Sequence, residues 1–445
     1  MRGDTWPARF ANLAGLYNSR SMESRFGTWS VIAALFLTAC GAAGPSATPL
    51  DSTQSPGTSP TVEATLTREP SRQSLTLWVP DTFSPEVPSP AGSLLADRLA
   101  SFEETHPGVD LAVRIKDVGG PAGLLDTLAA VSVAAPAVLP DVIALDPVAL
   151  SAATIKGLIV PLNGLVVEPA SPEWYAHALG VSSSEGEFFG LPFAAEAEIL
   201  SYDLTRYPRP PLSWAEILAG PAPFVFPAAD PYALFTLAEY VSLGGSLTDE
   251  SGRPSLDAGI LTEVLSFYAS SRAAGVIPLS ARQFAADSDT WAAVRGERAA
   301  GGTAPLSLFL SQHDPEKEAA LPLPTKGGAG ICFAETWSWA IVSQDAEHQR
   351  LSAELIVWLS EPEFLGPWTN ALGMLPPNRS ALGAWPGGLD RSIVSRLVSV
   401  SRPTPPGEVL VTFGPPLQAA VEAVLSGGAT PDAAAQAAVQ LISSP

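Results

Sequence analysis

Short apolar runs alternate with helix-like segments over the first folded part of the chain. The apolar runs are residues 75–79, 109–115 and 141–145, and the segments with helical spacing between them are 94–102 and 124–133. Strands separated by helices pair in parallel, so this part of the chain predicts an α/β sheet. Asp146 follows the third predicted strand, at the edge where sheets of this kind usually bind ligands.

The same alternation continues to the C-terminus. Apolar runs at 188–193 and 224–226 predict further strands. Helices are predicted from Ser213, over 231–243 and 256–274, around Trp291, over 345–359 and over 431–441. The first of these begins with a capping box at 213–216, and the last has Thr430 and Pro431 in the N-cap and N1 positions.

The first 39 residues have the layout of a secretory signal. Arg25 leads into fourteen residues without a charge, which end in a small side chain at Ala39. A membrane-spanning helix needs about 20 apolar residues, so this run is too short to be one. We predict a signal peptide over residues 1–39, with Met22 as the suspected true start. No later segment is expected to reach spanning length.

The signal ends in Leu37-Thr38-Ala39-Cys40, which resembles the bacterial lipobox. The resemblance implies that Cys40 is lipidated and becomes the first residue of the mature protein. Over residues 41–70, eighteen of thirty residues are Gly, Pro, Ser or Thr, a composition that buries too little apolar surface to fold. We therefore expect 40–72 to be a disordered tether, and the exported protein to be anchored to the outer face of the cytoplasmic membrane.

Composition narrows the class of partner. The formal net charge is −21, which argues against nucleic acid as a partner because binding it requires Lys and Arg to neutralise phosphates. Hydrophobic residues make up 46% of the chain and charged residues only 16%, which is typical of a well-buried globular body. Cys332 is the one cysteine besides Cys40, so no disulfide is predicted within the body.

Motifs for catalysis and for metal or cofactor binding are missing from the sequence. It has no GxSxG elbow, no HExxH and no phosphate loop, and its four histidines show no metal-ligand spacing. Glu196 and Glu198 would lie side by side on one strand, whereas the carboxylates of a glycosidase flank the substrate. Asp287 and Asp289 lack the rest of a calcium loop, so we expect a solvated turn there. We predict neither an enzyme nor a cofactor or metal site.

Eight short motifs follow one another from residue 140 onward. They are 140–142 with 157–162, 190–192 with 202–203, 213–218, 244–246, 291–294 with 296–300, 323–328, 339–341 and 354–360. Their order resembles that of the extracellular solute-binding proteins of ABC importers, the family typified by maltose-binding and other sugar-binding proteins. The likeness runs from about Leu75 to the C-terminus.

The resemblance implies an α/β, two-lobed periplasmic-binding-protein-like fold with a hinge and a central ligand cleft. Lobe 1 would comprise 73–195 plus about 303–340, and lobe 2 would comprise 196–302 plus about 341–445. The crossovers between the lobes would lie at 192–198, near 301–306 and near 339–344. Such proteins close on a ligand that touches both lobes, and their permease recognises the closed form.

The ligand-binding residues are predicted partly from this resemblance and partly from strand periodicity. Glu196 matches a hinge position where the maltose-binding relatives carry a glutamate that contacts the ligand. Trp337, Trp339 and Glu335 alternate along one predicted strand and therefore share a face. Because aromatic faces beside hydrogen-bonding groups suit sugar rings, we expect these residues to contact the solute, with burial in the core as the alternative. Weaker candidates are Asp81, Phe83, Asp146, Tyr232 and Trp291.

We therefore predict a lipid-anchored protein that captures a small solute, foremost a sugar or oligosaccharide, and delivers it to the permease subunits of an ABC transporter. Sugar-binding relatives often carry Gly-x-Trp soon after the motif at 296–300, but 301–306 has no tryptophan. That difference leaves room for a small polar or cationic ligand. Two alternatives stay open: an exported hydrolase that acts on polysaccharide, and a binding component that feeds a signalling receptor.

Overall fold

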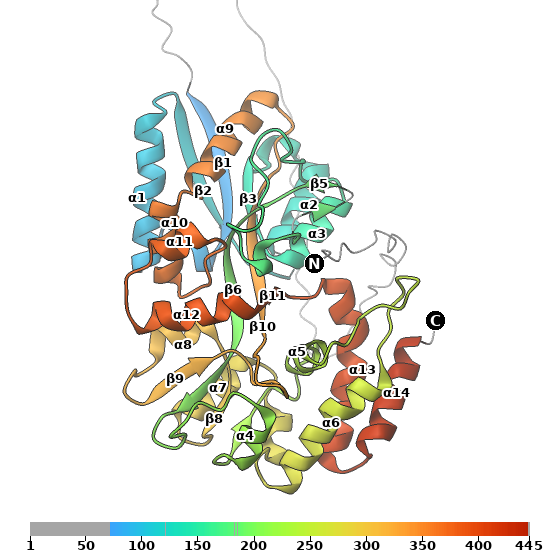
Figure 1. Cartoon of the computed structure of the whole chain (residues 1–445). Coiled ribbons are helices and arrows are strands. Elements are labelled where there is room, and N and C mark those ends of the chain that lie inside the picture. Colours follow the sequence, from blue (N-terminus) through green and yellow to red (C-terminus); the bar gives the residue numbers. More distant parts are fainter. Residues whose placement is uncertain (1–71, 121, 182, 185, 444–445) are drawn as a thin grey trace, which may run out of the picture. The chain divides into compact units, whose positions relative to one another are not determined.

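A computed structural model describes residues 72–443, except 121, 182 and 185. The predicted signal peptide, the start at Met22, lipidation of Cys40 and the tether up to residue 71 lie outside the described residues. The described body contains two lobes, which are joined by long strands (Figure 1).

The first lobe is built on three parallel strands, as the alternation of strands and helices predicts. The central strand β1 (Gln73–Pro80) pairs with β2 (Val109–Lys116) on one side and with β3 (Val142–Leu145) on the other. Helices α1 (Pro90–Thr105) and α2 (Leu124–Ala134) connect these strands, and α3 (Pro147–Ile155) follows the third strand. Two later helices, α9 (Ala346–Trp358) and α10 (Pro362–Leu372), complete the lobe. Figure 1 shows α1 and α9 on one side of the strands and α2 and α3 on the other.

The second lobe is mostly helical. Its helices are α4 (Trp214–Ala219), α5 (Leu234–Ser242), α6 (Ala258–Ala273), α13 (Gly407–Ser426) and α14 (Pro431–Ser443). The capping box at Ser213 forms as predicted, with the Ser213 and Glu216 side chains each accepting from the other's backbone. The helix expected from residue 231 begins later, at Leu234, because the Asp230 carboxylate instead holds a turn by accepting from the backbone N–H groups of Tyr232 and Leu234.

Two long strands run through both lobes. They are β6 (Leu191–Asp203) and β10 (Cys332–Ile341), which pair antiparallel in a sheet of order β2-β1-β3-β10-β6-β8-β7. Strand β8 (Gly301–Pro305) pairs with β6 and with the short β7 (Phe224–Val225). The remaining elements are β4 (Ser183–Ser184), β5 (Glu187–Phe188), α7 (Asp287–Arg295), α8 (Leu306–Gln312), β9 (Glu318–Leu321), α11 (Arg379–Gly383), α12 (Leu389–Val400) and β11 (Ser401–Pro403). Figure 1 shows β6 and β10 passing from the upper lobe to the lower one.

The buried apolar residues form one core in each lobe and a third cluster between them. The first core includes Leu355 and Trp368 of α9 and α10, although the sequence analysis placed everything after about residue 341 in lobe 2. The second core includes Leu323 and Phe333, which the sequence analysis placed in lobe 1. The reason is the direction of β10. This strand starts in the second lobe and ends in the first, so the helices that follow it pack on the first core.

Helix α13 differs from the expectation that no segment after the signal reaches spanning length. By length and composition alone, its 20 residues would suffice to cross a membrane. Phe413, Leu417, Val421 and Val424 lie in the second core, with at most 2% of their surface exposed. In the folded protein α13 is a core helix of the second lobe.

Candidate functional site

The two apolar cores are interrupted at the same level on one face of β6. Along this face, Ala194 belongs to the first core and Leu200 to the second. Between them the same face carries Glu196 and Glu198, because alternate residues of a strand point to one side. On the opposite face, Ala195, Ala197 and Ile199 are buried in the third cluster. On this face of β6, the two carboxylates therefore lie in the stretch between the cores, which neither core covers.

Strand β10 repeats this interruption. Phe333 lies in the second core, Trp337 lies in the first, and Glu335 stands between them as the only exposed residue of the strand. Glu335 is paired directly with Glu196 across the two strands. Side chains in such pairs have Cβ atoms about 5 Å apart, and like charges placed there are destabilising. Glu196, Glu198 and Glu335 form an acidic floor between the lobes, which we call the carboxylate floor.

Three further carboxylates interact with this floor from the ends of helices and loops. Asp146 is the N-cap of α3, where its Oδ1 accepts from the N–H of Ala149 at 2.8 Å. Asp230 holds the loop before α5, and Asp287 is the first residue of α7. The charge of Asp146 acts on Glu335, and the charges of Asp230 and Asp287 act on Glu198. The first lobe thus contributes Asp146 and the second contributes Asp230 and Asp287.

Desolvation by the surrounding protein raises the pKa of all six carboxyl groups, although several hydrogen bonds oppose the shift. The pKa of Glu335 rises to about 7, first through desolvation and then through the charges of Asp146 and Glu196. Its side chain nevertheless reaches solvent. A group that is both exposed and desolvated lies in a recess, which fits a position at the bottom of a cleft. The pKa of Asp287 also rises to about 7, through desolvation and the charges of Asp230 and Glu196, while a hydrogen bond from Thr303 opposes the shift.

The six carboxyl groups differ in how many hydrogen bonds their oxygens accept. Glu196 accepts from the N–H of Ala197 at 2.9 Å, from the N–H of Ser307 at 3.1 Å and from the Ser307 hydroxyl, so it also caps the start of α8. Glu198 is 7% exposed, and neither of its oxygens has a hydrogen-bond partner. Oδ1 of Asp287 is likewise buried without a partner. Buried polar atoms without partners are uncommon in native proteins and ask for an explanation.

The structure places the predicted aromatic residues mainly in cores. Trp339 is fully buried, and its ring stacks on Phe193 at a centroid distance of 4.2 Å. Trp337 is 6% exposed and meets Phe83 edge to face at 5.1 Å. Trp337, Trp339 and Glu335 alternate along β10 as predicted, but the face they share turns from the cleft into the first core after Glu335. In this conformation the Trp339 and Phe83 rings have no free face for a ligand, and both match the alternative of burial in the core.

The weaker candidates are scattered. Trp291 of α7 is 1% exposed in the third cluster and donates from Nε1 to Gln312, so it is also a core residue rather than a cleft residue. Tyr232 is 45% exposed and lies two residues after Asp230. Asp81 is exposed, and its backbone carbonyl accepts from the N–H of Ser84. Of the predicted residues, the structure brings Glu196, Glu335 and Asp146 together.

Sequence reasoning missed the second-lobe half of the site. Asp230 went unnoticed, Glu198 was weighed only as part of a hydrolytic pair, and Asp287 was expected in a solvated turn. Instead, the Asp287 carboxyl is largely buried against Thr303 and the floor. The one available signal was the position of each aspartate directly after an apolar run or at the start of a predicted helix. That signal is shared by ordinary capping residues.

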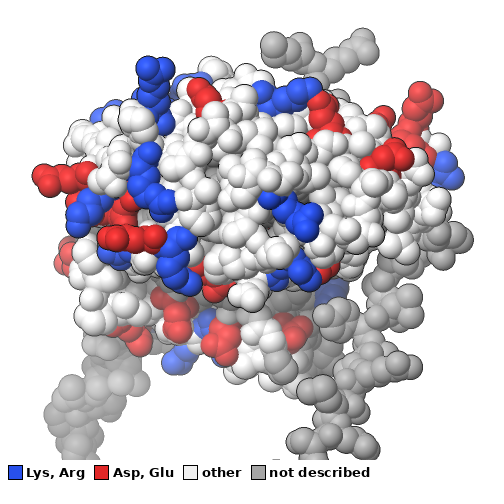
Figure 2. Space-filling model, turned by 90° about the horizontal axis from the view of Figure 1, so that it is seen from below, with Lys and Arg blue, Asp and Glu red and all other residues white. Residues whose placement is uncertain are grey.

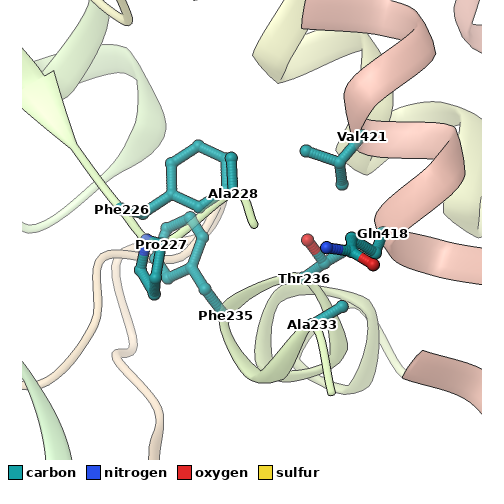
Figure 3. A pocket seen from close by; sticks show the side chains of 8 residues that line it. All are labelled: Phe226, Pro227, Ala228, Ala233, Phe235, Thr236, Gln418 and Val421. Carbon is teal, nitrogen blue, oxygen red and sulfur yellow. The ribbon is translucent and has the colours of Figure 1, made fainter. Parts of the chain in front are cut away.

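Two small cavities among the described residues lie away from the six carboxylates. Figure 3 shows one of them, where Gln418 and Val421 of α13 face Phe235 and Thr236 of α5. It has essentially no space for a water molecule, so it is a packing seam between two helices. Within the described ranges no group of three or more His, Cys, Asp or Glu side chains is arranged to hold a metal ion.

Figure 2 shows the face of the molecule that lies at the bottom of Figure 1. On this face Lys and Arg side chains stand apart, with Asp and Glu side chains and wide uncharged areas between them. A nucleic-acid-binding face would instead gather its basic side chains into a patch or stripe.

The fold is similar to that of several solved binding proteins. The GacH receptor of Streptomyces glaucescens is 18% identical with a TM-score of 0.62, and the match covers 83% of this chain and 97% of that one. A cyclic α-maltosyl-1,6-maltose binding protein from Arthrobacter globiformis is 16% identical, with a TM-score of 0.68 and coverage of 83% and 98%. The sugar-binding protein MalE from Xanthomonas citri is 18% identical, with a TM-score of 0.68 and coverage of 83% and 96%.

These similarities confirm the two-lobed α/β fold with a hinge and a central cleft. None of the curated proteins matches the chain in sequence. The model of the bacterial extracellular solute-binding proteins matches residues 97–385, which is well over half of the chain and includes all six carboxylates of the site. The chain therefore belongs to the bacterial extracellular solute-binding proteins.

Proposed function

We propose that this protein captures a carbohydrate solute outside the cell in the cleft above the carboxylate floor and delivers it to an ABC permease. The observation that carries the proposal is the interruption of both crossing strands at one level, with Glu196, Glu198 and Glu335 between two separate cores. Similar solved proteins bind acarbose, in the GacH receptor, and maltose, in MalE from Listeria monocytogenes, which supports a carbohydrate here.

Closure of the lobes follows from the way the groups are distributed. Asp146 belongs to the first lobe, whereas Asp230 and Asp287 belong to the second. A ligand that hydrogen-bonds to both sets stabilises the arrangement in which the sets approach each other, and it shifts the equilibrium by its differential affinity for the closed form. β6 and β10 pass between the lobes and are placed to act as the hinge. Carboxylate oxygens accept hydrogen bonds, so hydroxyl groups of the solute supply the matching donors.

Titration calorimetry with mono- and oligosaccharides tests this proposal. We expect one solute per chain and a smaller radius of gyration in solution scattering when the solute is bound. Glu335→Gln keeps the size of the side chain in the carboxylate floor. If this variant binds the solute with a changed affinity but unfolds at the same temperature, the heat of binding comes from this cleft. An absence of heat and of any compaction with every sugar and amino-group-bearing solute tried would count against solute capture.

The lipid anchor at Cys40 is the second part of the proposal, and it rests on the resemblance of 37–40 to a lipobox. Each buried acyl CH₂ contributes about 0.8 kcal/mol, so a lipidated Cys40 with more than one chain holds the protein firmly at the membrane. We expect Cys40→Ser to move the protein from the membrane fraction to the medium. Cys332→Ser, which changes a buried thiol in the body, is the matched control and should leave it at the membrane. Equal fractionation of the two variants would argue against the anchor.

One observation bears on the alternative of a polysaccharide hydrolase. Carboxyl groups stand on both lobes, and two of them, Glu335 and Asp287, have a pKa raised to about 7, as a general acid requires. Incubation with maltodextrin and chitin oligosaccharides, followed by chromatography, separates the two functions. We expect the sugars to be recovered intact, and release of shorter products that depends on Glu335 would assign the site to hydrolysis.

A further inference from the structure

The six carboxylates of the cleft have no cationic partner among the residues that the structure describes. They form two groups that act on each other electrostatically: Glu335 with Asp146 and Glu196, and Glu198 with Asp230 and Asp287. Asp287 also acts with Glu196, which links the groups across the floor. Among residues 72–443, none of the ion pairs made by Lys, Arg or His side chains involves any of these six groups. At a pH above the raised pKa values, the cleft therefore gathers negative charge that no cation of the described residues compensates.

Glu198 provides a second and independent indication. It is more than nine-tenths buried, both of its oxygens lack hydrogen-bond partners, and it faces Asp287 and Asp230. Leaving a buried acceptor unsatisfied costs the full desolvation of that group. A neighbouring buried acid is better supplied. Glu239, which is fully buried beside the same cluster, accepts from Trp214 Nε1 at 2.8 Å through one oxygen, and its other oxygen has no partner. Glu198 lacks a donor at both oxygens, which sets it apart from Glu239.

The tryptophans and phenylalanine predicted to line the cleft do not provide stacking surfaces for a sugar ring. Trp339 and Phe83 are at most 2% exposed and Trp337 only 6%. Among the predicted aromatic residues only Tyr232 keeps an exposed ring, so recognition in this cleft rests mainly on charge and hydrogen bonding. A hydroxyl group supplies donors but leaves the negative charge uncompensated, whereas an ammonium group supplies three donors and a positive charge. Charge-assisted hydrogen bonds of this kind are about twice as strong as neutral ones.

We infer that the solute carries a protonated amine, which binds between Glu198, Asp287 and Glu335. The inference rests on the proposed capture of a solute by the two lobes and specifies the charged group of that solute. An amino sugar would keep the carbohydrate assignment, whereas a short polyamine would replace it. Asp146 and Asp230 extend the same charge to either lobe, so an amine in the cleft attracts both lobes and favours closure. Electrostatic focusing by a cleft lined with one sign of charge also raises the rate at which a cationic solute enters.

Calorimetry on the purified protein at pH 8 tests the inference with matched solutes. Glucosamine is compared with glucose and with N-acetylglucosamine, in which the same nitrogen carries no charge, and spermidine represents the polyamines. We expect at least one of the two amines to bind at least 10-fold more tightly than the neutral sugars, with affinity that falls as salt is added. The amine that binds more tightly, glucosamine or spermidine, identifies the source of the charged group. Glu198→Gln should lower the affinity for that amine at least 10-fold.

Glu239→Gln is the matched control, because it neutralises a neighbouring buried acid that already has a donor, and it should leave the affinity within about twofold. Thermal unfolding of both variants shows that each is folded. If glucose and N-acetylglucosamine bind as tightly as glucosamine, and Glu198→Gln does not change the affinity, the inference is overturned. The proposed capture of a solute is then still supported. If no sugar or amine binds, both fail. A response to Ca²⁺ alone would assign the carboxylates to a metal ion and would also overturn the inference.

Discussion

Replacement of Trp339 with alanine should lower the free energy of unfolding by about 3–5 kcal/mol, the range expected when a buried aromatic side chain is truncated in a core. Trp339 has no exposed surface, stacks on Phe193 at 4.2 Å and lies parallel to Trp368 at 6.3 Å. The pairing of β6 and β10 is shifted between Trp337 and Ser338, which leaves Phe193 as an extra residue of β6 beside this indole. Truncation would therefore open a cavity where both crossing strands enter the first lobe.

Trp339→Phe is the control for this prediction. The buried Nε1 of Trp339 has no hydrogen-bond partner, so phenylalanine loses no bond and keeps a ring that can stack on Phe193. We expect it to cost about 1–1.5 kcal/mol, as moderate shape changes in a core do. Denaturant unfolding of both variants measures the difference. If Trp339→Ala kept its stability and lost only solute affinity, Trp339 would be a ligand contact and its assignment to the core would be wrong.

The stability of the ligand-free protein should rise as the pH falls from 8 towards 5. Asp287 has a folded-state pKa of about 7, above its ordinary value of 3.8, so the folded protein holds a proton there that the unfolded chain releases. Protonation therefore favours the folded state below pH 7, and the benefit is lost as the pH rises through 7. One unit of pKa is worth about 1.4 kcal/mol, and after allowance for partial solvent contact and for coupling to Glu196, Glu198 and Asp230, we expect about 2 kcal/mol from this group.

Asp287→Asn isolates that contribution. The variant should be more stable than the natural protein by about 2 kcal/mol at pH 8, because it removes a desolvated negative charge, and nearly equal to it at pH 5. Asp289→Asn on the same helix is the matched control. Its carboxylate is exposed and accepts from the N–H groups of Ala285 and Ala286, so the change weakens a helix cap at both pH values. A difference between Asp287→Asn and the natural protein that does not change with pH would contradict the assignment.

The elements of the first lobe could be predicted from the sequence because they depend on local patterns. Apolar runs of strand length separated by helical spacing gave β1, β2 and β3 to within a few residues, and they gave the parallel pairing of these strands. The capping box at Ser213 was equally local. The motif order that suggested the family also proved reliable, since the family model matches residues 97–385. The course of the chain after β10 was not predictable in this way, because no local feature of 346–372 says which lobe its apolar face covers.

The candidate site shows the same limit at the level of single residues. Periodicity correctly put Glu335, Trp337 and Trp339 on one face of β10, but a core and a cleft can occupy successive parts of one face. Only the three-dimensional positions of the two cores show that the boundary falls between Glu335 and Trp337. The distinction between Glu198 and Glu239 also has no sequence signal, because it depends on whether a distant side chain such as Trp214 reaches the carboxyl group.

The composition of α13 matters before the protein has folded at all. An extracellular protein crosses the membrane as an unfolded chain, and during that passage the apolar segment Gly407–Ser426 has no second lobe to cover it. Lipid accepts a segment only if it forms a helix there, and Pro415 and Pro416 each disfavour an isolated helix by about 3 kcal/mol. The tertiary contacts of the folded lobe can offset this cost, but the translocating segment has none. The proline pair should therefore make insertion of this segment into a bilayer less favourable than its hydropathy alone suggests.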